Sequence, residues 1–392
     1  MADRTTGEYV ESSLSGVRYR AFIPSPLPPN PSIVWTPELE ILRDAANQAL
    51  GRLDGIESIL PDTNLFLYQY VRKEAVLSSQ IEGTQSTLSD LLLFELDETP
   101  GVLADDVREV SNYVTALQFG LKRIQEGMPI SLRLLREIHA VLLRAGRGNT
   151  QEPGEFRRVQ VWLGGHTPTE AEFVPPPPER IMECLDPFER YLHDIPWRTP
   201  TLIKAALAHV QFETIHPFKD GNGRLGRLLI TLLLCAEKCL TQPLLYLSLY
   251  FKQNRDEYYD RLQAVRTKGD WEGWLEFFFK GIAETARLAV TTAHRLRKLF
   301  AQDREKLQSL GRGAGSAIRV HQILQEKLVI SVSLASATLH LSYPATNKAL
   351  EQLQELGLVR EVTAKRRNRL FVYSEYVAIL SEGTEPLKQS AN

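Results

Sequence analysis

The sequence predicts a mostly helical fold with one small β-hairpin and a C-terminal region that mixes helices and strands. Nine segments between residues 37 and 300 repeat apolar residues at three- and four-residue spacing, as amphipathic helices do. Residues 160–175 form two short β-like runs around Gly164 and Gly165, which favours a hairpin. Beyond residue 300 helical and strand-like runs both occur, which predicts a small α+β unit.

The predicted elements begin after an extended strap. Five prolines between residues 24 and 31 predict a strap with little regular structure over residues 21–37. The predicted helices then span residues 37–60, 64–82, 105–126, 131–145, 179–194, 200–214, 224–239, 254–268 and 270–300. Four consecutive prolines end the predicted hairpin, which we expect to be a lid or docking edge, the alternative being a surface decoration.

Length and composition predict a globular chain of two or three domains. The chain has 392 residues, of which 43% are hydrophobic and 24% charged, close to globular averages. Glycines 311, 313 and 315 favour a linker near residues 301–316. We therefore predict an N-terminal strap and helix (1–60), a core domain (61–300) and a C-terminal domain (301–392).

The net charge, the cysteines and the apolar runs limit the cellular locations and partners that the sequence predicts. A net charge of −2 excludes a surface built wholly for nucleic acid or for an anionic membrane. The three cysteines are too few for a disulfide framework and are not spaced as a zinc site. The N-terminus lacks the apolar core of an export signal, and the longest apolar run, residues 228–236, is too short to cross a bilayer. These features predict a cytoplasmic protein with no membrane partner.

The stretch 216–227, HPFKDGNGRLGR, lies between two predicted helices and suits anion binding. A pair of glycines, Gly221 and Gly223, at the start of a helix leaves backbone N–H groups free to face an anion, and the helix dipole adds positive potential. Arg224 and Arg227 are three residues apart, so both guanidinium groups project from one face of that helix.

Two further residues of the stretch add chemistry to this anion site. Asp220 supplies a hard oxygen of the kind that Mg²⁺ prefers. His216 has an unperturbed pKa near neutrality, which suits a general base. An anion cradle, two arginines, a metal-binding carboxylate and a base together predict phosphoryl or nucleotidyl transfer.

The stretch resembles the signature of the Fic (filamentation induced by cAMP) family, His-x-Phe-x-[Asp/Glu]-Gly-Asn-Gly-Arg-x-x-Arg, at every specified position. The resemblance covers about residues 60–300 and implies a Fic-type helical core with a small β-hairpin flap. The flanking matches are the helix before the loop (208–215), the flap and its entry (154–157, 161–165 and 173–178), and the helices that close the nucleotide pocket (254–259 and 269–272).

This resemblance implies transfer of AMP from ATP to a Ser, Thr or Tyr hydroxyl of a protein, which can be the chain itself, with Mg²⁺ as cofactor. His216 would be the catalytic base and Asp220 would hold Mg²⁺ between the α- and β-phosphates. Asn222 would contact the α-phosphate, Arg224 the β-phosphate and Arg227 the γ-phosphate. The nucleotide- and phosphate-binding residues that it implies are Gly221, Asn222, Gly223, Arg224, Leu225, Gly226 and Arg227.

A second resemblance concerns the segment 78–83, SSQIEG. Ser78, Glu82 and Gly83 match the family's inhibitory motif, [Ser/Thr]-x-x-x-Glu-[Gly/Asn]. It implies that Glu82 reaches Arg227, takes the place of the γ-phosphate and steers ATP into an unproductive pose. The alternative is an ordinary helix end with Gly83 just beyond it.

Asn254 and Tyr258 are candidates for the adenine end of the pocket, together with Tyr259. The alternative is a polar helix face with aromatic residues in the core. His139, His209 and His321 lie in helical patterns, and we interpret them as core or boundary histidines with satisfied partners.

The C-terminal region resembles a winged helix. Residues 332–341 and 345–356 predict two helices, the second capped by Ser342, and two β-like runs follow around the basic turn 365–368. Thr346, Asn347, Lys348 and that turn are candidates for DNA contact through phosphates. Residues 301–392 hold 12 basic and 9 acidic residues, and this small excess of positive charge is weak support for DNA binding. A protein-docking or dimerisation module is the alternative.

The sequence also leaves other functions open. Within the same fold the alternatives are transfer of UMP, phosphate or phosphocholine, and removal of AMP with Glu82 assisting. A different class is a DNA-binding regulator that senses a nucleotide. The intact His216 and Asp220 favour the enzyme. The expected partners are ATP and a protein substrate, and a homodimer is compatible with the sequence.

Overall fold

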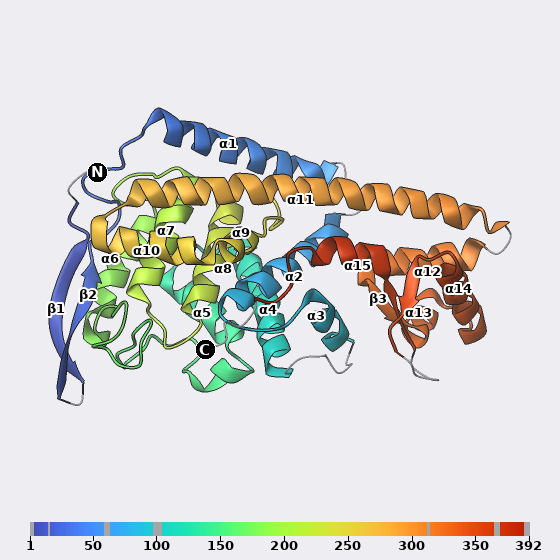
Figure 1. Cartoon of the computed structure of the whole chain (residues 1–392), viewed down its shortest axis with the longest axis horizontal. Coiled ribbons are helices and arrows are strands. Elements are labelled where there is room, and N and C mark those ends of the chain that lie inside the picture. The colour runs from blue at the N-terminus through green and yellow to red at the C-terminus, as the bar shows by residue number, and fades with distance from the viewer. Residues whose placement is uncertain are drawn as a thin grey trace.

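One long helix runs the length of the molecule and joins a large helical core to a smaller C-terminal unit (Figure 1). The computed structural model describes residues 4–14, 16–58, 63–96, 104–311, 314–363 and 369–387. The helices up to this long one are α1 (Pro37–Asp54), α2 (Thr63–Ile81), α3 (Leu88–Phe94), α4 (Ala104–Gln125), α5 (Leu132–Leu142), α6 (Ile181–Leu192), α7 (Thr201–Ile215), α8 (Asn222–Ala236), α9 (Ser248–Gln253), α10 (Arg255–Lys268) and α11 (Trp271–Gln308). Short 3₁₀ turns lie at Gly55–Ser58, Arg147–Thr150 and Pro178–Arg180.

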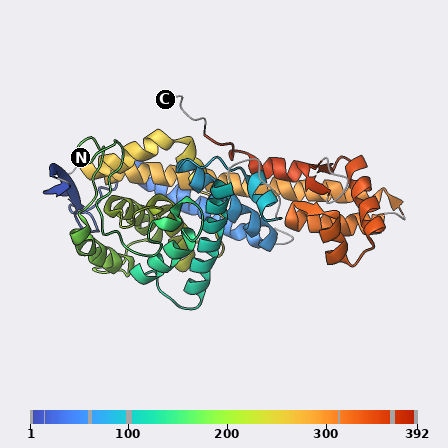
Figure 2. The same ribbon diagram turned by 90° about the horizontal axis from the view of Figure 1, so that it is seen from below.

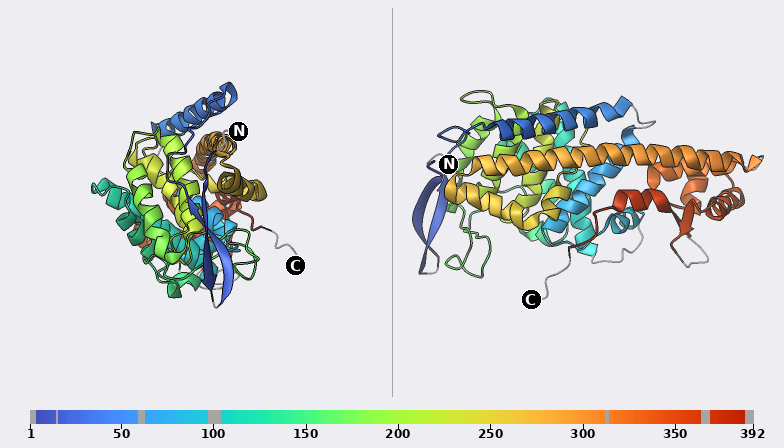
Figure 3. Two further views of the ribbon diagram at one scale, coloured as in Figure 1. Left: turned by 90° about the vertical axis from the view of Figure 1, so that its left-hand side faces the viewer. Right: turned by 45° about the horizontal axis from the view of Figure 1, so that its top comes forward.

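Helices α7 and α8 form the centre of the core and pack against each other. Every residue of α7 after Thr201 is buried, polar residues such as His209 and Glu213 included, because neighbouring helices cover each face. Helices α4, α5 and α2 pack on α8, α6 packs on α7, and α1 lies along α11 (Figures 1 and 3). The loop between α7 and α8, which holds the predicted motif, is therefore fixed at both ends by buried helices.

The nine predicted helices are confirmed: most ends move by up to three residues, but α1 ends at Asp54 and α11 at Gln308. The short helices α3 and α9 were not predicted, and the N-terminal strap is shorter than predicted. Strands β1 (Gly7–Leu14) and β2 (Val17–Pro24) pair antiparallel, with Gly7 opposite Pro24 and Leu14 opposite Val17. The prolines dominated the prediction for residues 21–37, whereas residues up to Pro24 belong to β2. The extended part begins at Ser25 and ends where α1 starts, with Thr36 as the N-cap of that helix.

The predicted hairpin at 160–175 is present as a flap with little regular structure. Leu163 and Phe173 form one antiparallel bridge, with N–H to O distances of 2.8 and 3.2 Å. Strand β2 backs the flap, because the Phe22 N–H donates to the Val174 carbonyl at 2.9 Å. Tyr19 packs on Val174 beside it. The N-terminal hairpin thus supports the flap, which the sequence did not predict.

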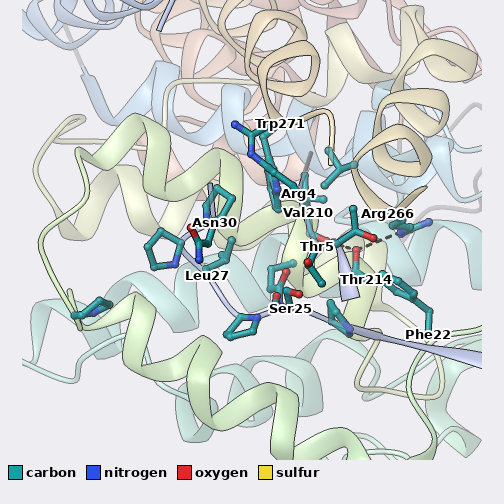
Figure 4. Close-up of a pocket in the computed structure, with 18 residues that line it drawn as sticks. Arg4, Thr5, Phe22, Ser25, Leu27, Asn30, Val210, Thr214, Arg266 and Trp271 are labelled. Carbon is teal, nitrogen blue, oxygen red and sulfur yellow. Dashed lines mark hydrogen bonds between the residues drawn. The ribbon is translucent and has the colours of Figure 1, made fainter. Parts of the chain in front are cut away.

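The strap after β2 covers a cavity of about 360 Å³ beside α7 and α10 (Figure 4). Ser25, Leu27 and Asn30 of the strap line one side, and Val210 and Trp271 line the other. The Gln211 side-chain amide donates to the Ser25 carbonyl at 3.0 Å and ties the strap to α7.

Helix α11 continues past residue 300, where the sequence suggested a boundary, and ends at Gln308. Its last turns share a buried core with the C-terminal unit: the Phe300 ring packs on Tyr373 and Tyr376, with centroid distances of 6.1 and 5.0 Å. The Tyr373 hydroxyl donates to the buried Asp303 carboxylate at 2.6 Å and also bonds to His321. A cut at 301 therefore divides one packed helix.

The C-terminal unit continues as α12 (Ala314–Lys327), β3 (Val329–Ser331), α13 (Val332–Leu339), α14 (Tyr343–Glu355), β4 (Val359–Glu361), β5 (Leu370–Tyr373) and α15 (Ser374–Ser381). Its strands form an antiparallel sheet in the order β3-β5-β4. Figure 2 shows this unit at one end of the molecule, away from the N-terminal hairpin. Thr346 is fully buried and so unavailable for DNA contact, and the basic turn 365–368 lies outside the described residues. In the described part of the chain, no helix is both long and apolar enough to cross a membrane.

Candidate active site

His216 lies directly after α7 in a left-handed conformation, with φ +49°. A non-glycine residue seldom adopts this conformation, and where it does the surrounding structure must hold it. The His216 N–H donates to the Phe212 carbonyl at 2.9 Å, and the helix ends there.

Two buried arginines hold the last turn of α7. Arg157 donates from Nε to the His216 carbonyl at 2.8 Å and from Nη2 to the Pro176 carbonyl at 2.6 Å, which joins the loop after α7 to the end of the flap. Arg266 donates to the Thr214 hydroxyl and the Glu213 carbonyl, both at 3.2 Å (Figure 4 shows the Thr214 contact). The carbonyl groups at a helix C-terminus lack partners within the helix, and these guanidinium groups satisfy two of them.

His139 and Phe218 hold the loop between α7 and α8 in place. The two rings stack with centroids 3.8 Å apart, and Phe218 is fully buried, as an anchor residue should be. His139 Nδ1 accepts from the Gly154 N–H at 2.8 Å, so its Nε2 carries the proton that reaches the Asp220 carbonyl at 2.9 Å. The prediction of a core histidine with satisfied partners is confirmed for His139.

Asn222 also braces the loop. Its side-chain oxygen accepts from the Phe218 N–H at 2.9 Å, and its side-chain nitrogen donates to the Phe218 carbonyl at 2.8 Å. Both ends of the carboxamide are therefore bonded to the loop, and the first residue of α8 is 2% exposed. These bonds fix the Asn222 side chain against the loop, and its contact with the α-phosphate stays a prediction.

Burial and the two bracing arginines keep His216 neutral. Burial lowers the pKa of His216 to about 3, and the positive charges of Arg157 and Arg266 act in the same direction. The Glu213 carbonyl and the Glu82 carboxylate oppose this shift only in part. At neutral pH the imidazole is therefore unprotonated, which is the form that a general base needs.

Arg227 and Glu82 form the contact that the inhibitory motif implies. Arg227 Nη2 lies 2.6 Å from Glu82 Oε1, and Arg227 also donates to the Ser78 hydroxyl at 2.9 Å and to the Ser78 carbonyl at 3.0 Å. Burial raises the pKa of the Glu82 carboxyl, but Arg227 outweighs it and holds the pKa below its usual value. Gly83 follows with φ +98°, so the helix-end interpretation also holds for that residue.

The Glu82 carboxylate also lies over the first turn of α8. A Cβ on Gly223 would overlap Glu82 Oε1, so a larger residue there would displace the Glu82 carboxylate. Among the described residues, no side chain caps the N-terminus of α8. An anion therefore already sits where the helix dipole and Arg227 converge.

A second carboxyl group, that of Glu213 on α7, lies beside α8 about one helical turn after Gly223. A Cβ on Gly226 would overlap Glu213 Oε1 and would push that carboxyl group away. Burial raises the pKa of Glu213 to about 7, with the Arg227 and Arg266 charges opposing and the Glu82 charge reinforcing the shift.

Arg224 has different partners from Arg227, although the two are only three residues apart on α8. Its Nη1 lies 3.0 Å from the Glu109 carboxylate of α4, and both side chains are buried. Its Nη2 is 3.4 Å from Asp220, whose own side chain is 43% exposed. A single accessible carboxylate at the mouth of the loop suits Mg²⁺, which usually takes one or two carboxylates and fills its other positions with water and phosphate oxygens. No cluster of three or more metal-binding side chains occurs among the described residues.

A cavity of about 720 Å³ lies beside His216 and Arg227 and is large enough for a nucleotide, whereas Asp220, Asn222 and Arg224 do not line it. It brings together six of the predicted residues and also Glu213 and the flap residues Trp162, Leu163 and Phe173. The predicted residues in its wall are Glu82, His216, Gly223, Arg227, Tyr258 and Tyr259.

Other predicted residues lie elsewhere. Leu225 is fully buried in the core, and Asn254 and Gly83 line a neighbouring cavity that shares Arg255 and Asp256 with the first. The Asn254 side chain donates to the Tyr250 carbonyl at 3.0 Å. Tyr258 is 1% exposed and its hydroxyl bonds to His209 at 2.8 Å, which favours the core alternative for its side chain.

Sequence reasoning missed the roles of Arg157, Arg266, Glu109 and Glu213. The first two act on backbone carbonyl groups, which carry no pattern in the sequence. Glu109 and Arg224 are 115 residues apart, so their pairing appears only in the fold. Glu213 lies three residues before His216, but the chain turns out of the helix at His216, so helical spacing does not predict that both line one cavity.

Comparison with protein families agrees with this geometry. Residues 42–122 match the Fic/DOC family N-terminal region, which includes Ser78 and Glu82, and residues 129–234 match the Fic/DOC family, which includes the whole loop. The chain belongs to the Fic/DOC family.

Two curated relatives are similar to it. The protein adenylyltransferase Fic of Aedes aegypti is 31% identical over 294 residues, which are 69% of this chain and 55% of the relative. That of Culex quinquefasciatus is 34% identical over 199 residues, covering 48% and 37% respectively. The chain thus spans about half the length of the first relative and less of the second. A crystal structure of a Fic family protein from Desulfovibrio desulfuricans G20 covers 87% of this chain and 97% of its own, with a TM-score of 0.58 at 19% identity, which supports the fold.

Proposed function

We propose that this chain is an autoinhibited protein adenylyltransferase, which transfers AMP from ATP to a protein hydroxyl and releases pyrophosphate. One observation carries the proposal: the Glu82 carboxylate occupies the point where Arg227 and the uncapped first turn of α8 converge. That point is built to bind an anion, and His216 lines the same cavity. The name of the curated relatives supports adenylyl transfer as the reaction.

The chain's residues divide the work of the reaction. Neutral His216 accepts the proton of the attacking hydroxyl. The backbone N–H groups at the start of α8 and the Arg227 guanidinium bind the phosphates and stabilise the charge that develops on them. The flap, fixed to the His216 carbonyl through Arg157, places the acceptor segment beside the imidazole.

Mg²⁺ fits this arrangement with Asp220 as its protein ligand. Asp220 is accessible and lies next to the phosphate-binding turn of α8. When bound, the ion neutralises phosphate charge and polarises the phosphoryl oxygens. Arg224 stays paired with Glu109, so this arginine is held in place before the nucleotide arrives.

The reaction is tested with ATP that is labelled separately at the α- and γ-phosphates. Adenylyl transfer predicts protein-bound label from the α position and none from the γ position, with pyrophosphate released. Label from the γ position on protein would instead identify a kinase. The test uses the Glu82→Gly variant as well as the wild-type chain, because inhibition lowers the wild-type signal.

We further propose that the C-terminal unit is a winged helix, on the support of the element order α12-β3-α13-α14-β4-β5. DNA contact, a homodimer and a cytoplasmic location stay predictions from the sequence. Lys348 is an exposed candidate for phosphate contact on α14.

A further inference from the structure

The face of α2 that points away from Arg227 is held by residues 382–387, which we call the C-terminal segment. Ser78 and Glu82 lie on the face toward Arg227. Lys73 and Gln80 are two helical turns apart, on a face about 170° away at ~3.6 residues per turn. Figures 1 and 3 show the chain running back from α15 to the helical core. Helix α2, which we call the inhibitory helix because Glu82 directly follows it, is thus bound on two opposite faces, by Arg227 on one and by the C-terminal segment on the other.

Side chains of α2 and α9 bind backbone carbonyl groups of the C-terminal segment. Lys73 Nζ donates to the Glu382 carbonyl at 2.8 Å, and Gln80 Nε2 donates to the Thr384 carbonyl at 2.8 Å. Both α2 side chains are 1% exposed. From α9, Lys252 Nζ donates to the Gly383 carbonyl at 3.0 Å and also to the Glu385 carbonyl.

The shape of the groove matches this segment. Gly383 has φ +79°, and a Cβ there would lie 2.7 Å from Leu249 Cδ1, so both the conformation and the space call for glycine. Thr384 is 2% exposed. Arg295 on α11 binds the Glu382 carboxylate through two bonds of 2.6 Å and sets where the segment begins. The segment therefore has a defined binding site, which we call the seat. It is formed by Lys73, Gln80, Leu249, Lys252 and Arg295.

Gln80 connects this seat to the inhibitory glutamate. The same Nε2 donates to the Ser86 carbonyl at 2.8 Å, across the turn that contains Glu82 and Gly83. Lys73 and Lys252 are buried cations whose pKa values burial lowers to about 8. When the segment leaves, Lys73, Gln80 and Lys252 lose these carbonyl partners. The face of α2 opposite Arg227 then loses its fixed contacts, and the helix is free to shift.

We propose that the C-terminal segment is a built-in regulator that holds the inhibitory helix in place: docked, it keeps Glu82 on Arg227, and released, it lets Glu82 withdraw. Its occupant is this chain's own segment, which α15 delivers by packing on α2 and α3. The inference rests on the proposed adenylyl transfer, because that activity is the readout. It gives the C-terminal unit a route to the active site that needs no direct contact with the nucleotide.

The test compares two truncations of the full chain. One ends after Ser381 and removes the C-terminal segment, and the matched control ends after Leu387 and keeps it. Each is made with Glu82 and with Glu82→Gly. We expect loss of the segment to raise self-labelling from α-labelled ATP at least 5-fold when Glu82 is present and to add less than 2-fold in Glu82→Gly. The control truncation should change neither.

A second variant covers the case in which truncation impairs folding. Lys252→Met weakens the seat from α9 without touching α2, and we expect 2- to 5-fold more self-labelling than wild type. Amide exchange in residues 78–86 should also speed up, because the last turn of α2 loosens. A merely structural loss would lower labelling in both backgrounds.

The outcomes separate the two hypotheses. If Glu82→Gly takes no label from the α position, the proposed function is wrong. If Glu82→Gly is labelled but neither loss of the segment nor Lys252→Met raises labelling or exchange, the regulatory inference is wrong. Equal activation by the control truncation would also overturn it, since the C-terminal segment would not be the cause.

Discussion

Replacing Glu82 by glycine should activate the enzyme, and the structure indicates by how much. The substitution removes one charge-assisted bond of 2.6 Å to Arg227 and an anion from the N-terminus of α8. A charge-assisted bond is worth about 1.5–3 kcal/mol. Because the Glu82 side chain is 36% exposed, solvent screens it and about 1.5–2.5 kcal/mol is the appropriate range. At 1.36 kcal/mol for each factor of ten, self-labelling should rise roughly 10- to 70-fold.

Arg227 stays in position without Glu82, because its Nε and Nη2 bonds to the Ser78 hydroxyl and carbonyl remain. The freed guanidinium edge can then take the γ-phosphate. Glu82→Gln is the matched control: it keeps the size and hydrogen-bonding capacity but not the charge, and should activate less than glycine. Arg227→Ala should abolish labelling in both backgrounds, since the γ-phosphate contact is missing.

The assay is self-labelling with α-labelled ATP, followed on denaturing gels over time, with γ-labelled ATP as the background. A fall in labelling for Glu82→Gly would refute the inhibitory role and make Glu82 a catalytic or hydrolytic group. No change, with only a small loss of stability, would mean that Glu82 serves as an ordinary helix end.

The remaining predictions concern the groups around the loop. His216→Ala should lower label transfer by ~10²–10⁴-fold while nucleotide affinity, measured by calorimetry, stays within about threefold, and unchanged transfer would remove His216 as the base. Arg157→Met should lower transfer about tenfold without weakening nucleotide binding, because it releases the His216 carbonyl from the flap, and equal losses in both would point to general misfolding. Glu213 holds its proton up to pH about 7 in the folded chain but only to about 4.3 when unfolded, so its contribution to stability is full below pH 4.3 and lost as the pH rises to 7. In denaturant titrations Glu213→Gln should therefore gain on wild type by on the order of 3 kcal/mol between pH 4.5 and 7.5, and a constant difference would contradict the raised pKa. Gly226→Ala should destabilise the chain by about 1–3 kcal/mol, and Glu213→Ala should restore part of that loss, because the two groups compete for one space.

The sequence was most informative where one local pattern determines the structure. The helices of the core follow from apolar spacing, and the loop at 216–227 follows from its glycines and charges. The prediction that Glu82 meets Arg227, 145 residues away, came from the family resemblance and agrees with the contact in the structure.

What the sequence could not predict rests on backbone partners and long separations. Strands β1 and β2 were missed because the prolines that follow them dominated the interpretation. Asn254 is typical of the family pattern, yet its side chain closes onto its own helix turn. The seat of the C-terminal segment joins residues 131 to 309 positions apart through carbonyl groups, which any residue can supply.

Arg227 is the point at which inhibition and catalysis share one physical requirement. A guanidinium that is 2% exposed needs an anion beside it, and Glu82 or a γ-phosphate can serve. Exchanging one for the other keeps the local charge balanced, so α8 and the His216 loop need not move. The helix that must move is α2, which is held on one face by Arg227 and on the other by the C-terminal segment. Control of this site therefore reduces to control of α2, and any partner that draws α15 away from the core acts on the rate without touching the nucleotide.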